Sequence, residues 1–269
     1  MDPPAAVVAG PLDAYPPADV ARLVEAVGIK KANTELVPTL ALGVLAGAFI
    51  AFGAMLFTLV MTGNGLGFGP GRWLGGIAFS LGLILVIIGG AELFTGNSLI
   101  VMAWADRRIT AQQLLRNWSL VYVGNAVGAL GTALMVDWSG VLALGDGAVG
   151  ATAVAIAEGK VALGLAEAFW RGVLCNVLVC LAVWLCFAAH SVSSRIMAII
   201  FPISAFVALG FEHSIANMYL IPIAMLSAET GIGMLDILGN LVPVTLGNIV
   251  GGGVLVALVY WLIYLRPAR

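Results

Sequence analysis

The sequence predicts an all-α membrane protein with six transmembrane helices in an inverted 3+3 repeat, in which helices 2 and 5 are interrupted. Three observations predict this fold. The chain of 269 residues is 61% apolar and only 10% charged, whereas soluble domains carry about a quarter charged residues. Six apolar segments are each long enough to cross a bilayer core, which takes about 20 helical residues. The two halves of the chain also repeat the same polar motifs.

Residues 1–35 are expected to form a cytoplasmic tail that ends in an amphipathic helix. Proline, alanine and glycine dominate the first part, and apolar residues recur at helical spacing between Pro16 and Lys31. Such a helix would lie at the membrane surface or at a subunit contact. Because the segment lacks the apolar core of a signal peptide, we expect no cleavage here.

Residues 36–265 are expected to be a single transmembrane domain with repeats at 36–138 and 161–265, followed by a short cytoplasmic tail at residues 266–269. A Gly- and Ala-rich connection from Asp137 to Lys160 would join the two repeats. The six apolar segments are approximately Leu36–Met61, Leu74–Met102, Leu114–Trp138, Val161–Ala189, Ile196–Met225 and Leu235–Leu265.

Lysine and arginine residues concentrate at alternate ends of these segments. The N-terminus, the loops after the second and fourth segments and the C-terminus hold most of them, whereas the opposite loops hold Arg72 and Lys160. The positive-inside rule therefore predicts a multi-pass protein of the cell (inner) membrane with both termini cytoplasmic. Arg171 falls within the fourth segment and is expected to pair or snorkel. The net charge of −2 argues against nucleic acid as a partner.

The internal repeat is visible in two pairs of segments. Segment two contains GAELFTGN at residues 90–97, and segment five contains GFEHSIAN at residues 210–217, so that Gly, Glu and Asn recur with an offset of 120 residues. Segments three and six share an Asn followed seven residues later by GNxxG, beginning at Asn117 and Asn240. Two repeats of three spans must insert in opposite directions, and such folds place their site near the midplane, where helices are interrupted.

Glu212, His213 and Asn217 bring polar groups into the middle of an apolar segment. Such groups are costly at bilayer depth and are functional candidates by default. For Glu212 or Asn217 alone, a hydrogen bond that joins helices is the simpler interpretation. The three cysteines number too few and lack the spacing of metal ligands, so we expect no metal, cofactor or disulfide framework.

At these residues the sequence resembles the formate–nitrite transporter family, over about Pro17 to Leu265. The resemblance is carried by residues 91–97, by Asn117-Trp118 with Gly124-Asn125, and by residues 210–218. It implies an aquaporin-like protomer and a homopentamer in the lipid bilayer, with one pore in each protomer. The implied function is a channel for formate or a similar small weak-acid anion, rather than an enzyme.

The resemblance also implies which residues line the substrate pathway. His213 matches the pore histidine, Thr95 the threonine of the loop that interrupts segment two, and Lys160 the basic residue of the outer vestibule. Asn176 and Asn217 match polar residues near the histidine, and Glu212 is placed on the same pathway. The implied constrictions are apolar, with Leu83 and Leu93 on the cytoplasmic side and Phe79, Val179 and Phe206 on the other side.

The expected mechanism addresses the cost of moving an anion through an apolar neck. A bare charge in low dielectric costs roughly tens of kcal/mol and usually neutralises instead. Lys160, peptide dipoles and helix N-termini would gather the anion, and His213 would stabilise or protonate it so that it passes as the neutral acid.

Three alternatives remain open at this point. Nitrite or hydrosulfide could be the main substrate within the same family. A neutral-solute channel is disfavoured because neither Asn97 nor Asn217 is followed by proline. An intramembrane enzyme that uses Glu212 and His213 is disfavoured because no nucleophile, metal cluster or phosphate loop accompanies them.

Overall fold

The computed structural model describes residues 14–227 and 230–266, and every regular element in those ranges is helical. The elements are α1 (Pro17–Ala32), α2 (Leu36–Met61), α3 (Phe68–Gly89), η1 (Gly96–Ile100), α4 (Val101–Ala105), α5 (Ala111–Trp138), η2 (Val141–Ala143), α6 (Ala148–Val161), α7 (Leu165–Ala188), α8 (Val192–Ala208), α9 (Ser214–Ser227), α10 (Met234–Ile249), η3 (Val250–Leu258) and α11 (Val259–Tyr264).

Five of these helical stretches are long and apolar enough to cross a membrane. They are α2, α3, α5, α7 and the continuous stretch Met234–Tyr264, which comprises α10, the π-helical η3 and α11. Shorter apolar helices cover Gly96–Ala105, Val192–Ala208 and Ser214–Ser227. The prediction of an all-α protein with membrane-spanning helices is thus confirmed.

Non-helical chain separates α3 from η1 and α8 from α9. After α3, Gly90 adopts a left-handed conformation with φ +79°, and after α8, Gly210 does so with φ +72°. Glycine enters this region without the steric cost that a Cβ atom imposes. The two glycines that the repeated motif shares therefore sit at the turns where the helices end.

The connection between the two halves differs from the expectation. Residues Ala148–Val161 form the helix α6, and α7 begins at Leu165 rather than near Val161. Alanine has the highest helix propensity, and the alanine content that looked like a loosely structured connection favours this helix. Lys160 consequently lies in the last turn of a helix, which fixes its position.

Close backbone contacts between long helices hold the fold together. A Cβ atom on Gly47 of α2 would overlap the carbonyl oxygen of Asn125 on α5, and one on Gly128 of α5 would overlap that of Val44. In the second half, Gly251 approaches the carbonyl oxygen of Val173 on α7 in the same way. Small residues permit such close approach between membrane helices.

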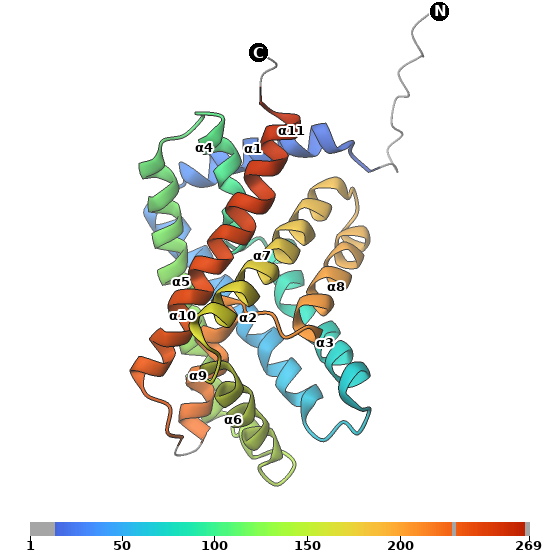
Figure 1. Cartoon of the computed structure of the whole chain (residues 1–269), viewed down its shortest axis with the longest axis vertical. Coiled ribbons are helices and arrows are strands. Elements are labelled where there is room, and N and C mark those ends of the chain that lie inside the picture. The colour runs from blue at the N-terminus through green and yellow to red at the C-terminus, as the bar shows by residue number, and fades with distance from the viewer. Residues whose placement is uncertain (1–13, 228–229, 267–269) are drawn as a thin grey trace, which may run out of the picture.

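Helices α1 and α11 lie at one end of the molecule and α6 lies toward the opposite end (Figure 1). The amphipathic helix was expected at the membrane surface or at a subunit contact. In the structure α1 buries Val20, Ala21 and Val24 in a cluster with residues of η1, α4 and α7, so that one face of this helix packs on its own chain.

Candidate functional site

Two cavities enter the protein from opposite ends. The α6-side cavity, of about 400 Å³, is bordered by Lys160, Glu212 and His213 among others. The α1-side cavity, of about 290 Å³, is bordered by residues that include Lys31 and Glu92. The first non-helical stretch borders the α1-side cavity through residues 90–93, and the second borders the α6-side cavity through residues 210–213.

His213 is the residue that ends the second non-helical stretch, directly before α9. Its side chain borders the α6-side cavity, and the residue is only 3% exposed. The backbone N–H of Ala216 donates to His213 Nδ1 over 3.1 Å. Because Nδ1 is held as an acceptor, the neutral ring carries its proton on Nε2. The Nε2–H then donates to Thr95 Oγ1, 2.9 Å away.

The His213–Thr95 hydrogen bond connects the two non-helical stretches directly. Thr95 is fully buried at the end of the first stretch, and its neighbours Leu93 and Gly96 border the α1-side cavity. The backbone carbonyl of Thr95 accepts from Asn176 Nδ2 at 3.2 Å. One hydrogen-bonded pair therefore lies between the residues that border the two cavities.

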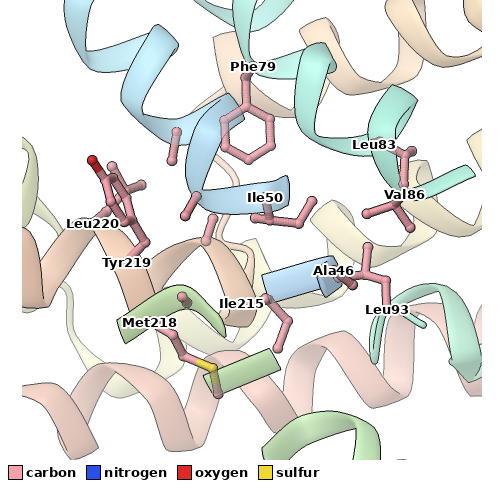
Figure 2. Packing of buried hydrophobic residues seen from close by; sticks show 14 of the residues in the cluster. Ala46, Ile50, Phe79, Leu83, Val86, Leu93, Ile215, Met218, Tyr219 and Leu220 are labelled. Atoms are coloured by element: carbon pink, nitrogen blue, oxygen red, sulfur yellow. The ribbon is translucent and has the colours of Figure 1, made fainter. Parts of the chain in front are cut away.

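The predicted apolar constrictions are divided between these cavities. Phe79 and Phe206 border the α6-side cavity, with ring centroids 5.6 Å apart, and the Phe206 ring stacks on His213 at 6.0 Å. Leu83 and Leu93 border the α1-side cavity. Figure 2 shows Leu83 and Leu93 together beside Val86, with Phe79 on another side of the cluster. Val179 is buried and borders neither cavity.

Lys160 is held in a closed polar network with Glu212, which precedes α9, and with residues of α9 and α10. Its Nζ lies 2.9 Å from Glu212 Oε1, and Asn217 Nδ2 donates to Glu212 Oε2 over 2.7 Å. Asn217 also donates to Asn240 Oδ1, and Asn240 donates to the backbone carbonyl of Lys160. The carboxylate of Glu212 thus neutralises Lys160 and fixes Asn217, which supports the structural interpretation of both residues.

A second network of the same composition lies beside the α1-side cavity. Lys31 Nζ lies 3.2 Å from Glu92 Oε1, and Asn97 Nδ2 donates to Glu92 Oε2 over 2.7 Å. Asn97 also donates to Asn117 Oδ1, and Asn117 donates to the backbone carbonyl of Lys31. These four contacts have counterparts in the first network, whereas the bond from Lys31 Nζ to Asn97 Oδ1 at 2.8 Å is specific to the second. The sequence reasoning missed Lys31, although Lys160 and the repeated Glu and Asn residues pointed to a partner lysine.

Two further asparagines hold the non-helical stretches. Asn125 Oδ1 accepts from the backbone N–H of Phe94 over 2.9 Å, and Asn248 Oδ1 accepts from that of Ser214 over 2.9 Å. Their amide groups donate to the carbonyls of Glu92 and Glu212, respectively. The backbone N–H groups of Phe94, Ser214 and Ala216 are therefore satisfied by side chains of the protein.

Asn176 and Asn217 border neither cavity. Asn176 Nδ2 donates to Thr95 O, Ser98 Oγ and Asn248 O, so it links the loop that contains Thr95 to η1 and α10. Of the predicted pathway residues, His213, Lys160 and Glu212 border a cavity and Thr95 contacts His213. In the described ranges, 14–227 and 230–266, no group of three His, Cys, Asp or Glu residues could hold a metal ion.

Comparison with known proteins identifies the family. The model of the formate/nitrite transporter family matches residues 18–262. The chain belongs to this family. Together with the five apolar helices, this makes it a multi-pass membrane protein.

Individual relatives agree with this assignment. The chain is 42% identical to the formate channel FocA of Escherichia coli K12, with 95% of this chain and 96% of that protein covered. It is also 42% identical to a probable formate transporter of Methanothermobacter thermautotrophicus, with 93% and 97% covered.

Solved structures share the fold. A pentameric formate channel with formate bound superposes with a TM-score of 0.80 at 40% identity, covering 86% of this chain and 98% of that chain. A channel described as an FNT family ion channel superposes with a TM-score of 0.81 at 30% identity, covering 91% and 98%. These relatives are described as channels or transporters.

Proposed function

We propose that this protein is a formate channel in which the substrate passes each protomer between the α6-side and α1-side cavities. The observation that carries the proposal is the buried hydrogen bond from His213 Nε2 to Thr95 Oγ1, which lies between residues that border the two cavities. The formate channels among the relatives support formate as the substrate.

Desolvation decides how the substrate passes. A bare carboxylate that passes the apolar side chains of Phe79, Phe206, Leu83 and Leu93 would lose its hydration there, a cost of roughly tens of kcal/mol by the Born estimate. The neutral acid avoids most of this cost. Formate therefore enters the cavity as the anion, takes up a proton from hydronium there to form formic acid, crosses the neck as the neutral acid and releases the proton on the other side.

His213 acts in this mechanism as a hydrogen-bond donor. Because the N–H of Ala216 occupies Nδ1, the ring offers one proton, on Nε2. The Nε2–H can break its hydrogen bond to Thr95 and donate instead to a formate oxygen. The Thr95 hydroxyl can then donate to the same formate oxygen. A hydrogen bond to a charged partner contributes about 1.5–3 kcal/mol, which lowers the barrier for the arriving anion.

The finer architecture that we propose is a six-crossing, aquaporin-like inverted repeat. In it, α3 with η1–α4 forms one interrupted crossing, and α8 with α9 forms the other. The matched networks of Lys31, Glu92, Asn97 and of Lys160, Glu212, Asn217 support a two-fold relation between the halves. They also extend each repeat to include α1 or α6, beyond the boundaries expected from the sequence.

The assembly and its orientation are part of the same proposal. The pentameric state of the formate channel with formate bound supports a homopentamer, with one substrate path in each protomer. The basic residues near α1, α4 and α11 support cytoplasmic termini in the cell (inner) membrane. The α1-side cavity then opens to the cytoplasm, and the α6-side cavity with Lys160 opens to the outside.

Formate uptake by proteoliposomes of the purified pentamer tests the function. We expect saturable uptake of labelled formate that rises as the external pH falls, with weaker competition by nitrite and hydrosulfide. Stronger competition by either of those anions would reassign the substrate within the family. Osmotic swelling by a neutral solute without any formate flux would overturn the proposal.

A further inference from the structure

Two arginines, Arg72 of α3 and Arg171 of α7, meet at the end of α8. Arg72 Nε donates to the carbonyl of Ala208 over 2.7 Å and its Nη2 to that of Val207 over 3.1 Å. Arg171 Nη1 donates to the carbonyl of Gly210 over 3.0 Å. Both side chains border the α6-side cavity. Arg171 is paired, as the sequence predicted, because its Nη2 forms an ion pair with Glu167. On the cavity side, however, its Nη1 contacts only the neutral peptide group of Gly210.

The two guanidinium groups are brought close together at Gly210. A Cβ atom on this glycine would lie 3.0 Å from Arg72 Nη2 and 3.3 Å from Arg171 Nη1. The absence of a side chain at Gly210 leaves room for both cations over the turn that precedes His213. Two positive charges this close repel each other, and carbonyl oxygens at the end of a helix offset that cost only in part.

The charges around the α6-side cavity do not contribute equally to its potential. Lys160 is paired with the buried carboxylate of Glu212 at 2.9 Å, so the field of this pair falls off as that of a dipole. The ion-pair partner of Arg171, Glu167, is half exposed and does not border the cavity. Arg72 has no ion pair within 4.0 Å among the described residues.

We propose that Arg72 and Arg171 form the site at which a small carboxylate anion is first captured, and that Lys160 is mainly a structural partner of Glu212. The inference rests on the proposed function, because it assigns the entry step of the same path. Arginine suits the role because its guanidinium keeps its charge and presents several donors in a fixed plane that matches a carboxylate. Arg72 Nη1 and Arg171 Nε make no hydrogen bond among the described residues, so these donors remain for the anion.

The test is the dependence of the initial uptake rate on external formate concentration and on ionic strength, for the full-length pentamer in cells or oriented vesicles. Arg72→Gln and Arg171→Gln should each raise the half-saturating formate concentration about 5-fold, the effect of one unit charge near 4 Å in water. The maximal rate should stay within about 2-fold, and the double variant should lose most of the salt dependence, because screening acts on the charges that were removed. Arg116→Gln is the matched control, since Arg116 also donates to a backbone carbonyl, that of Thr34, and borders neither cavity.

Conservative variants separate charge from packing. Arg72→Lys and Arg171→Lys keep the charge but lose the planar donors, so their half-saturating concentrations should lie between those of wild type and of the glutamine variants. The inference is overturned if the lysine variants behave as the glutamine variants do, or if both glutamine variants match wild type. A wild-type protein that carries no formate would instead refute the proposed function, so the two failures are distinguishable.

Discussion

At the scale of single residues, the ion pair of Lys160 and Glu212 is the more deeply buried of the two matching pairs. The two side chains are 14% and 4% exposed, whereas those of Lys31 and Glu92 in the matching network are 27% and 14% exposed. Removing one partner of a buried pair leaves an uncompensated charge, which costs more as water becomes less accessible. The two networks share four contacts, but they should differ in their sensitivity to substitution.

We predict that Lys160→Met destabilises the protein by about 3–5 kcal/mol, the cost of breaking a buried pair, and that Lys31→Met costs less. Thermal unfolding of the detergent-solubilised pentamer measures both. Glu212→Gln in the Lys160→Met background should recover part of the loss, because the stranded carboxylate is gone. Lys30→Met, at an exposed position of α1, serves as the control. Equal shifts for Lys160→Met and Lys30→Met would contradict the structural role of Lys160.

At the scale of elements, the contact between α2 and α5 depends on two glycines. Gly47 and Gly128 each face a carbonyl oxygen of the other helix, so closely that a Cβ atom would overlap it. Backbone atoms cannot rotate away as a flexible side chain can. The same contact positions Asn125, which holds the first non-helical stretch next to Thr95.

We predict that Gly47→Val separates α2 from α5, with loss of the assembled pentamer or of most formate flux. Gly131→Ala on α5 is the control, because a Cβ atom there meets nothing within 4 Å. Size-exclusion chromatography and uptake of labelled formate give the two readouts. A Gly47→Val protein with wild-type assembly and flux would show that this helix contact is not required.

Helix α1 carries a carboxyl group whose titration affects its packing. Burial and the neighbouring Asp106 raise the pKa of Glu25 above its usual value, and Arg108 opposes this shift. Because the folded state binds the proton more tightly than the unfolded state, this group adds stability as the pH falls through the raised pKa. Above that pH the charged carboxylate weakens the contact of α1 with the end of α4.

Glu25→Gln should therefore stabilise the packing of α1 at neutral pH and flatten its pH dependence in the mildly acidic range. Hydrogen exchange of the α1 amides, measured across that range for the purified pentamer, reports the effect. Glu35→Gln, at the exposed residue before α2, is the comparison. Faster exchange of α1 in Glu25→Gln than in wild type at neutral pH would reverse the sign and refute the assignment.

At the scale of the whole molecule, the sequence predicted an all-α membrane protein, and its repeated motifs begin at Gly90 and Gly210, where the structure has turns. Hydropathy and repeated motifs are properties of the sequence itself, so they can be recognised without coordinates. Helix α6 was missed because an Ala- and Gly-rich stretch between apolar segments has no strong periodicity. Lys31 and Arg72 were missed as cavity residues because their partners lie about 60 residues or more away in the chain.

The candidate site also has features that the sequence predicts and features that only the structure shows. His213 and Thr95 were predicted from the family resemblance, and the structure places them in hydrogen-bond contact. Only coordinates reveal that Ala216 fixes the tautomer of His213 or that Glu212 neutralises Lys160. The sequence left open whether His213 stabilises or protonates the anion, and the first contact supports stabilisation by a hydrogen bond. The second contact supports a structural role for Lys160, which was expected to gather the anion.

The central claim is that formate crosses the protein with a proton, past the imidazole of His213. Stopped-flow measurement of formate-driven internal acidification in proteoliposomes tests it most directly, with wild-type and His213→Ala pentamers compared at equal protein content. We predict that His213→Ala lowers the coupled flux about 10- to 100-fold, the effect of losing one hydrogen bond to a charged partner, while the pentamer stays assembled. Coupled flux equal to that of wild type in an assembled His213→Ala pentamer would contradict the account.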